Sequence, residues 1–451
     1  MTMAAVVSSA AVAPRTRSRA GRERVRSAIA RFIAAPASPL PFGVLRIGLG
    51  LVLLVQALSV VSNLADAYGT RGLVQSVLVD RLVPPLTPRV GWFVALFAAI
   101  GVDEIVAIRL FFVLHLGAVL AFTAGWRSRL AAVLTWATFV MLTTSGPLYT
   151  YGVDRFVRIA LFYCMFAPIG AALSCDVVAG RTSGAPAAAA RLWLRVLQVH
   201  LLVVYAASGI EKASGAQWWN GEALWRSMMR PDLGTLDFGW VASVPWLARI
   251  GCWATLLLEC GYALFVWPRR TSKWWVLAIL AMHAGIALVL GLWLFSATMM
   301  LLSFSAWLVP CEPRTLQASR RSGFTVAYDG ACRVCRSVVG LAFELDRSGF
   351  LPIGRDHPRR VPALAGTGRL DRMVTVDRDG RMRSGADAFL AMWAHALSWP
   401  AIGKLARLAP VRAGYALFTR HRHELGCRGA CSRPARDVER TPPGPVAPPH
   451  D

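Results

Sequence analysis

Charged residues are scarce in this chain of 451 residues: Asp, Glu, Lys and Arg together make up only 16% of it. Soluble domains carry about a quarter charged residues, so the deficit argues against an ordinary soluble protein. Hydrophobic residues make up 55%, and the mean hydropathy is +0.48. The apolar runs are about 20 residues long, which is enough to cross a bilayer. The composition therefore predicts a protein that crosses the membrane several times.

Acidic residues are also few, 25 against 49 Lys and Arg, and the formal net charge is +24. No nucleic-acid module, such as zinc-ligand spacing or an RNP-type sequence, is recognisable, so nucleic acid is not expected as a partner. The arginines instead flank apolar segments, as the positive-inside rule requires.

The N-terminus lacks the order of a secretory signal, because a small-residue stretch, Ala4 to Ala13, precedes the basic run from Arg15 to Arg31. We interpret residues 1–38 as a basic cytoplasmic tail, which is disordered or lies on anionic lipid.

Residues 39–310 are predicted to form an all-α polytopic membrane domain. We expect eight transmembrane helices in it, at 42–63, 105–124, 130–147, 156–174, 193–211, 246–267, 274–291 and 293–309. The last two form one apolar run broken near Gly291, which predicts a tight helical hairpin. The arginine-rich loops fall on one side if the N-terminus is inside. We therefore expect a multi-pass protein of the inner (plasma) membrane with both termini in the cytoplasm and the lipid bilayer as its partner.

The character of the chain changes after Pro310. Strands are expected at 324–330, at 350–354 and on both sides of an Asp-Gly turn in 373–385, with helices at 332–347 and 386–397. This order indicates a small α/β domain over about 320–432. The remaining residues, 433–451, are rich in Pro and Arg and look disordered.

Cys332 and Cys335 stand at the predicted start of a helix, in the run YDGACRVC. Exposed N–H groups and the helix dipole favour a thiolate there, so the pair is interpreted as a redox-capable dithiol. Two alternatives remain: a pair of unreactive cysteines, or a structural zinc site completed by Cys427 and Cys431. We expect no metal. A permanent disulfide is not expected either, because the cytoplasm is reducing.

Three segments resemble the DCC family of predicted thiol-disulfide oxidoreductases: YDGACRVC, DGRMRSGADAF and YALFTRHRHELGCRGAC. The resemblance covers about 324–432 and implies a thioredoxin-like fold, with Asp329 beside the two cysteines and a cytoplasmic thiol reductant as partner. One departure is the residues before Met373: thioredoxins place a substrate-docking proline there, and this chain has Leu370, Asp371 and Arg372.

Lys212 ends the fifth apolar segment on the predicted outer side. An amine withdrawn from water can act as a base, and ionisable groups within a membrane are functional candidates. The alternative is a lysine that snorkels to an interface marked by Trp218 and Trp219. Asp154 and Arg158 open the fourth segment at the same face, as a polar cluster or as a helix cap with interface anchors.

Six segments together resemble the HTTM family, the membrane domain shared with vitamin K-dependent gamma-carboxylases: residues 41–51, 68–73, 152–168, 173–176, 204–224 (VYAASGIEKASGAQWWNGEAL, which includes Gly221) and 282–301. The resemblance covers about 39–310. It implies Lys212 as the base that deprotonates a quinol, His283 as a second polar group of the same cavity, and a quinone as cofactor.

Two departures from the carboxylases argue against carboxylation of a protein substrate. The loop 145–154 lacks their histidine, and their large extracytoplasmic domain is absent. The preferred hypothesis is an oxidoreductase that couples the dithiol to a quinone-like, lipid-soluble substrate. The alternative is a non-enzymatic scaffold, or a peptide maturation or export partner, with a degenerate DCC domain. A transporter is disfavoured because no inverted repeat is visible.

Overall fold

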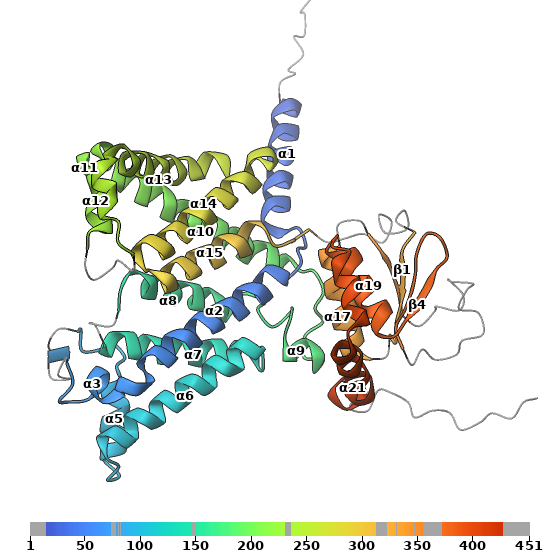
Figure 1. Cartoon of the computed structure of the whole chain (residues 1–451), viewed down its shortest axis with the longest axis horizontal. Helices are drawn as coiled ribbons and strands as arrows, with labels where there is room; N and C mark the ends of the chain where they lie inside the picture. The colour runs from blue at the N-terminus through green and yellow to red at the C-terminus, as the bar shows by residue number, and fades with distance from the viewer. Residues whose placement is uncertain are drawn as a thin grey trace, which may run out of the picture. The chain divides into compact units, whose positions relative to one another are not determined.

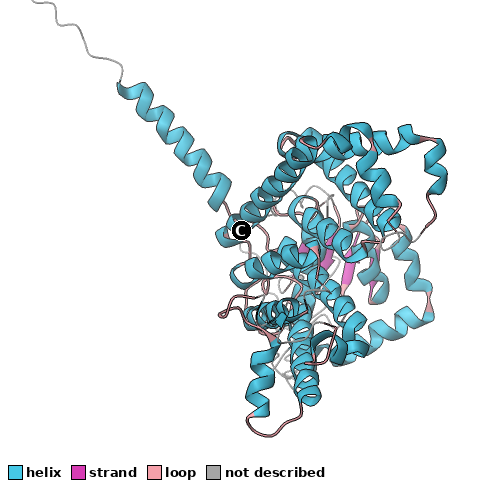
Figure 2. Cartoon of the chain, turned by 90° about the vertical axis from the view of Figure 1, so that its left-hand side faces the viewer, coloured by secondary structure: helices cyan, strands magenta, loops and turns pink. Residues whose placement is uncertain are grey.

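The computed structural model describes residues 15–426 except 74–77, 80, 82, 147–149, 231–235, 313–322, 331, 347–348 and 355–371. The predictions for Cys427, Cys431 and 433–451 lie outside this range. Helices make up most of the described chain, and the strands gather in one small sheet (Figure 2). The chain divides into two compact units, the N-terminal unit Met1–Pro313 and the C-terminal unit Arg314–Asp451.

The N-terminal unit is helical in its described residues (Figure 1). Its longer helices are α1 (Arg15–Ala34), α2 (Leu40–Val60), α5 (Val90–Ala98), α6 (Glu104–Ala124), α7 (Ser128–Ser145), α8 (Gly152–Phe166), α10 (Ala188–Ala213), α13 (Pro245–Phe265), α14 (Arg269–Leu290) and α15 (Trp293–Trp307). Short helices lie between them: α3 (Leu64–Tyr68), α9 (Cys175–Val178), α11 (Ala216–Asn220), α12 (Glu222–Met228) and the 3-10 turns η1 (Val61–Asn63) and η3 (Gly239–Ser243).

Five of the described helices are long and apolar enough to cross a membrane, which indicates a membrane protein: Leu40–Tyr68, Glu104–Ala124, Ala188–Ala213, Pro245–Phe265 and Arg269–Leu290. The count of eight is therefore not confirmed. The other three predicted segments fall on α7, α8 and α15. At 1.5 Å per residue, a helix of 15 residues is only about 22 Å long, and α8 and α15 both have 15 residues.

The sequence contains the reason why α8 is shorter than predicted. We expected a helix over 156–174, but α8 ends at Phe166, and Ala167 is extended with a ψ of 156°. Pro168 follows, and a proline disfavours helical geometry in the residue before it. The hairpin predicted near Gly291 is confirmed: α14 ends there with a φ of 67°, and α15 packs back against α14.

Helix α1 covers Arg15–Ala34 of the segment interpreted as a basic tail, disordered or bound to lipid. Its apolar residues Val25, Ile29, Phe32 and Ile33 are exposed at helical spacing. The carbonyl of Phe32 accepts a hydrogen bond from Nε of Arg195 at 3.1 Å. An apolar stripe on an arginine-rich helix is typical of helices that lie on a membrane surface, which keeps the lipid-bound alternative for this segment.

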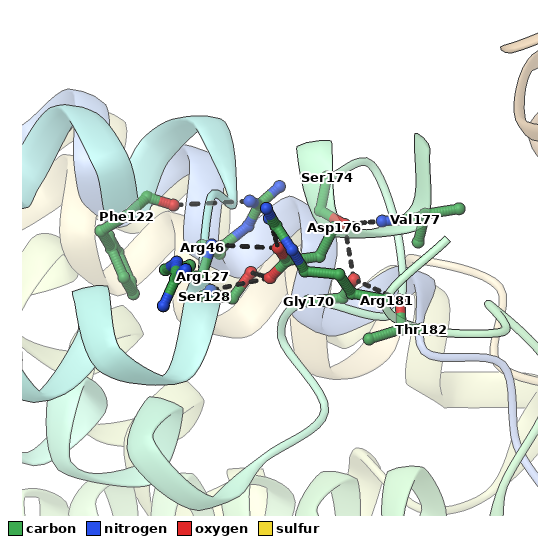
Figure 3. A network of polar contacts seen from close by, with 10 residues as sticks. All are labelled: Arg46, Phe122, Arg127, Ser128, Gly170, Ser174, Asp176, Val177, Arg181 and Thr182. Atoms are coloured by element: carbon green, nitrogen blue, oxygen red, sulfur yellow. Dashed lines mark hydrogen bonds and ion pairs between the residues drawn. The ribbon is translucent and has the colours of Figure 1, made fainter. Parts of the chain in front are cut away.

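A buried polar network joins the start of α2 to the turn between α6 and α7 and to the loop at 170–182 (Figure 3). Arg46 of α2 is fully buried and donates to the carbonyls of Leu173 at 2.5 Å and Phe122 at 3.4 Å. The carboxylate of Asp176 accepts bonds of 2.7 to 3.0 Å from Ser128, Arg181 and the backbone of Arg127.

The electrostatics of Asp176 reflect this network. Burial alone would raise the pKa of its carboxyl group. The hydrogen bonds from Ser128, Arg181 and Arg127 outweigh burial, and the pKa is lowered. Asp176 is therefore an ionised anchor that fixes the turn between α6 and α7.

The C-terminal unit has the predicted β-α-β order followed by a hairpin and a helix. Its elements are β1 (Thr325–Ala327), α17 (Arg333–Leu345), β2 (Leu351–Ile353), β3 (Val374–Val376), β4 (Met382–Ser384), α19 (Ala386–Ala396), α20 (Ala401–Lys404), η5 (Leu405–Arg407) and α21 (Ala409–Gly426). The sheet order is β2-β1-β3-β4, with β1 parallel to β2 and antiparallel to β3. The Asp-Gly hairpin is confirmed, since Gly380 has a φ of 74° between β3 and β4.

Candidate functional site

The two cysteines of the predicted dithiol lie at the start of α17. Cys332 is the N-cap residue, and its sulfur accepts a hydrogen bond from the backbone N–H of Cys335 at 3.5 Å. Both residues are thiols here rather than a disulfide. A sulfur at the N-cap of a helix lies at the positive end of the helix dipole, and this stabilises its thiolate form. The local geometry thus suits thiol–disulfide exchange.

The dithiol is enclosed. Cys332 is 0% exposed and Cys335 is 6% exposed. A cavity beside Cys335 is lined by Tyr328, Asp329, Met373, Tyr415 and others, and its volume of about 10 Å³ suits a single water. Burial raises the pKa of Tyr328 in this cavity. Tyr415 and Phe418 of α21 form part of the wall of this cavity beside Cys335.

Lys212 lies at the C-terminal end of α10, where it forms a partly buried ion pair. Its Nζ is 2.8 Å from Oε2 of Glu259 on α13, and it also donates to Oγ of Ser208. The side chain of Lys212 is 23% exposed and that of Glu259 is 8% exposed. The ring of Trp218 covers the ammonium at 5.4 Å. Glu259 lies within the apolar segment predicted at 246–267, but the sequence does not identify it as the partner of Lys212.

His283 does not contact Lys212 directly. On α14, its Nε2 is 2.9 Å from the hydroxyl of Tyr205, which is also 3.3 Å from Oγ of Ser303 on α15. Nδ1 of His283 is buried and has no hydrogen-bond partner among the described residues. Tyr205 and Ser208 both belong to α10, as Lys212 does, so the two polar centres line one face of the same helix.

The polar residues on this face of α10, called the polar stripe below, have a regular spacing that could have been found in the sequence. Arg191, Gln198, Tyr205 and Lys212 follow one another at intervals of seven residues, which places them on one face of a helix. Gln198 donates to the carbonyl of Ala306 at 2.7 Å. Helices α10, α13, α14 and α15 lie together around this face (Figure 1). Tyr205 is thus a site residue that sequence reasoning missed.

The other supporting residues make structural contacts. Asp154 forms a capping box with Tyr151 at the start of α8 and accepts from Gln56 at 2.8 Å. Arg158 donates to Oγ1 of Thr143. These contacts match the helix-cap interpretation.

Trp219 and Gly221 lie in the segment that follows α10. The indole of Trp219 donates to the carbonyl of Ala213 at 2.8 Å. Gly221 has a φ of 95°, and a Cβ there would lie 2.8 Å from the backbone nitrogen of Arg249. The backbone conformation at position 221 therefore requires a glycine.

Comparison with known proteins bears on the C-terminal unit. The family model of the DCC1-like thiol-disulfide oxidoreductases matches residues 326–428, which include both cysteines. No curated protein and no solved structure matches the chain. A DCC1-like domain and several apolar helices fit a membrane-associated redox protein.

Proposed function

We propose that this protein is a membrane-bound thiol–disulfide oxidoreductase whose working group is the Cys332–Cys335 dithiol. The main supporting observation is that Cys332 caps α17 and accepts a hydrogen bond from the backbone N–H of Cys335. Both cysteines lie inside the region matched by the DCC1-like family model. The parallel β1–α17–β2 unit followed by the β3–β4 hairpin supports a thioredoxin-like fold for this unit. A cytoplasmic thiol system is the proposed reductant.

The proposed acceptor is a quinone in the membrane. Oxidation of the dithiol to a disulfide releases two electrons and two protons, and a quinone takes up both to become a quinol. Because a quinone diffuses within the bilayer, the two units do not need to touch. The resemblance of residues 39–310 to the HTTM family supports this acceptor. Lys212 and His283 are the proposed groups for its proton chemistry, with Glu259 as the partner that holds the lysine.

The first test is a redox titration of the full-length protein in detergent, read by mass-spectrometric mapping of the linked Cys332 and Cys335 peptides. We expect one reversible disulfide per chain. Cys332→Ser and Cys335→Ser should each abolish it, because the partner sulfur is lost. Cys311→Ser, a thiol of the N-terminal unit, is the matched control and should leave the titration unchanged. Two thiols that never pair would refute the dithiol.

The enclosure of the sulfurs predicts how fast they react. Tyr415→Ala should open the cavity beside Cys335 and speed alkylation of this thiol about tenfold, since reaction of a buried thiol requires local opening. An unchanged rate would show that Tyr415 does not limit access.

The quinone step is tested separately. The reduced protein should convert one equivalent of a soluble menaquinone analogue to its quinol, followed by absorbance, with disulfide formation at Cys332–Cys335. Formation of the disulfide without quinol would reject the quinone and retain the oxidoreductase.

The enclosed dithiol also keeps the scaffold alternative open, since a buried pair of cysteines can serve as a packing element. Retention of the cellular phenotype in the Cys332→Ser, Cys335→Ser double variant would favour this alternative.

A further inference from the structure

A second candidate site lies in the N-terminal unit, among α2, α6, α7 and the residues around them. It is a cavity of about 250 Å³. Its wall is mainly apolar and includes Leu53, Ala57, Val60, Phe112, Phe139, Leu142 and Leu294. Neither Lys212, Tyr205 nor His283 contributes to it, so the cavity is distinct from the polar stripe on α10.

His115 is the polar side chain of this wall whose tautomer can be assigned from its hydrogen-bond geometry. It is 2% exposed, and its Nδ1 lies 2.9 Å from Oγ1 of Thr138. The hydroxyl of Thr138 lies 2.7 Å from the carbonyl of Leu134, to which it donates. A hydroxyl has only one proton to donate, so with the Thr138 proton on the carbonyl of Leu134 we assign the hydrogen of the ring to Nδ1.

The second ring nitrogen of His115 is therefore an acceptor. In a neutral imidazole only one nitrogen is protonated, and an unpaired charge is strongly disfavoured in an apolar wall. Nε2 has no hydrogen-bond partner among the described residues, and the His115 ring lines the cavity. The wall thus offers a fixed lone pair to a ligand that donates a hydrogen bond.

The size and charge of the cavity narrow the ligand class. A dry apolar cavity of about 150 Å³ binds benzene, so 250 Å³ accommodates one aromatic ring with small substituents. The rings of Tyr68, Phe112 and Phe139 in the wall can pack against such a ring. None of the described lining residues is a lysine or an arginine, which disfavours a carboxylate or a phosphate.

We propose that this cavity binds a small aromatic alcohol of the phenol class, whose hydroxyl donates a hydrogen bond to Nε2 of His115. An adjoining depression of about 450 Å³ shares Thr150 and Tyr151 with the cavity. The site does not include the dithiol or Lys212, so the binding proposal can be tested independently of the proposed redox function.

The test uses the full-length protein in detergent with 4-fluorophenol as the probe, followed by fluorine NMR. We expect saturable binding that is about tenfold weaker for fluorobenzene, which lacks the hydroxyl, because tenfold corresponds to about 1.4 kcal/mol, which is within the range that a buried hydrogen bond contributes. His115→Phe keeps the ring and removes the acceptor, so it should weaken 4-fluorophenol binding about tenfold as well. Ala57→Phe should abolish binding by filling the cavity.

The matched control is His200→Phe on α10, where the histidine bonds Tyr163 outside the cavity. It should leave binding unchanged. The proposal is overturned if fluorobenzene binds as tightly as 4-fluorophenol, if Ala57→Phe binds normally, or if the wild type shows no saturable binding because the cavity holds only water. Should His115→Phe fail to fold, nitrogen NMR of labelled histidines decides: an Nε2 resonance that does not move with 4-fluorophenol rejects the contact.

Discussion

Replacing Lys212 with methionine is expected to lower the free energy of unfolding by about 3 kcal/mol, because it leaves the carboxylate of Glu259 buried without its cation. Glu259 is 8% exposed, whereas Lys212 is 23% exposed. Glu259→Leu should therefore cost less, about 1 to 2 kcal/mol, since the remaining lysine can extend its ammonium towards water. The two substitutions remove the same ion pair but differ in which charge is left behind.

The double variant Lys212→Met, Glu259→Leu should recover most of the loss, because replacing a buried ion pair with apolar residues is often nearly neutral. Lys273→Met, at an exposed position near the start of α14, is the matched control and should change stability by less than about 0.5 kcal/mol. Reversible unfolding in mixed micelles gives all four values. Losses that simply add in the double variant would show that the pair is not coupled.

Gly125→Ala is expected to cost about 3 kcal/mol or more, because it combines backbone strain with overpacking. Gly125 has a φ of 69°, and a Cβ there would lie 1.6 Å from Nη1 of Arg46 and 2.5 Å from Cβ of Ser174. Arg46 is fully buried and bonded to two carbonyls, so its guanidinium has little room to retreat. The substitution should loosen the network of Figure 3.

The same helix provides the control for this prediction. Gly117 of α6 has open space where a Cβ would stand, so Gly117→Ala should be neutral or stabilise by up to about 1 kcal/mol. Thermal unfolding in detergent compares the two variants directly. Equal melting temperatures would mean that Arg46 moves aside without loss, and the rigidity assigned to the network would be wrong.

Helices, the hairpin and the position of the dithiol could be predicted from the sequence, because residues close together in the chain determine them. The apolar runs predicted helices, Asp379 and Gly380 predicted the hairpin, and the spacing of Cys332 and Cys335 predicted a dithiol at a helix start. The end of α8 before Pro168 was also readable and was missed, because the apolar run continues past it. The difference between the eight predicted spans and the five described helices that are long and apolar enough to cross a membrane has partly the same origin, since hydropathy does not measure where a helix stops.

The hydrogen-bond and ion-pair partners of the buried polar groups could not be predicted from the sequence. Glu259 is 47 residues from Lys212, and nothing in a hydropathy pattern says which intramembrane charge faces another. Thr138 lies 2.9 Å from Nδ1 of His115 only because α6 and α7 pack side by side.

The sequence by itself determined a helical, membrane-embedding N-terminal unit and a DCC1-like dithiol unit, because hydrophobicity and motif spacing act along the chain. The tertiary structure alone decided that Lys212 is paired, that Cys332 is enclosed, and that His115 lines a cavity. Those properties depend on which helix faces meet across tens of residues, since a buried polar atom must find its partner in space.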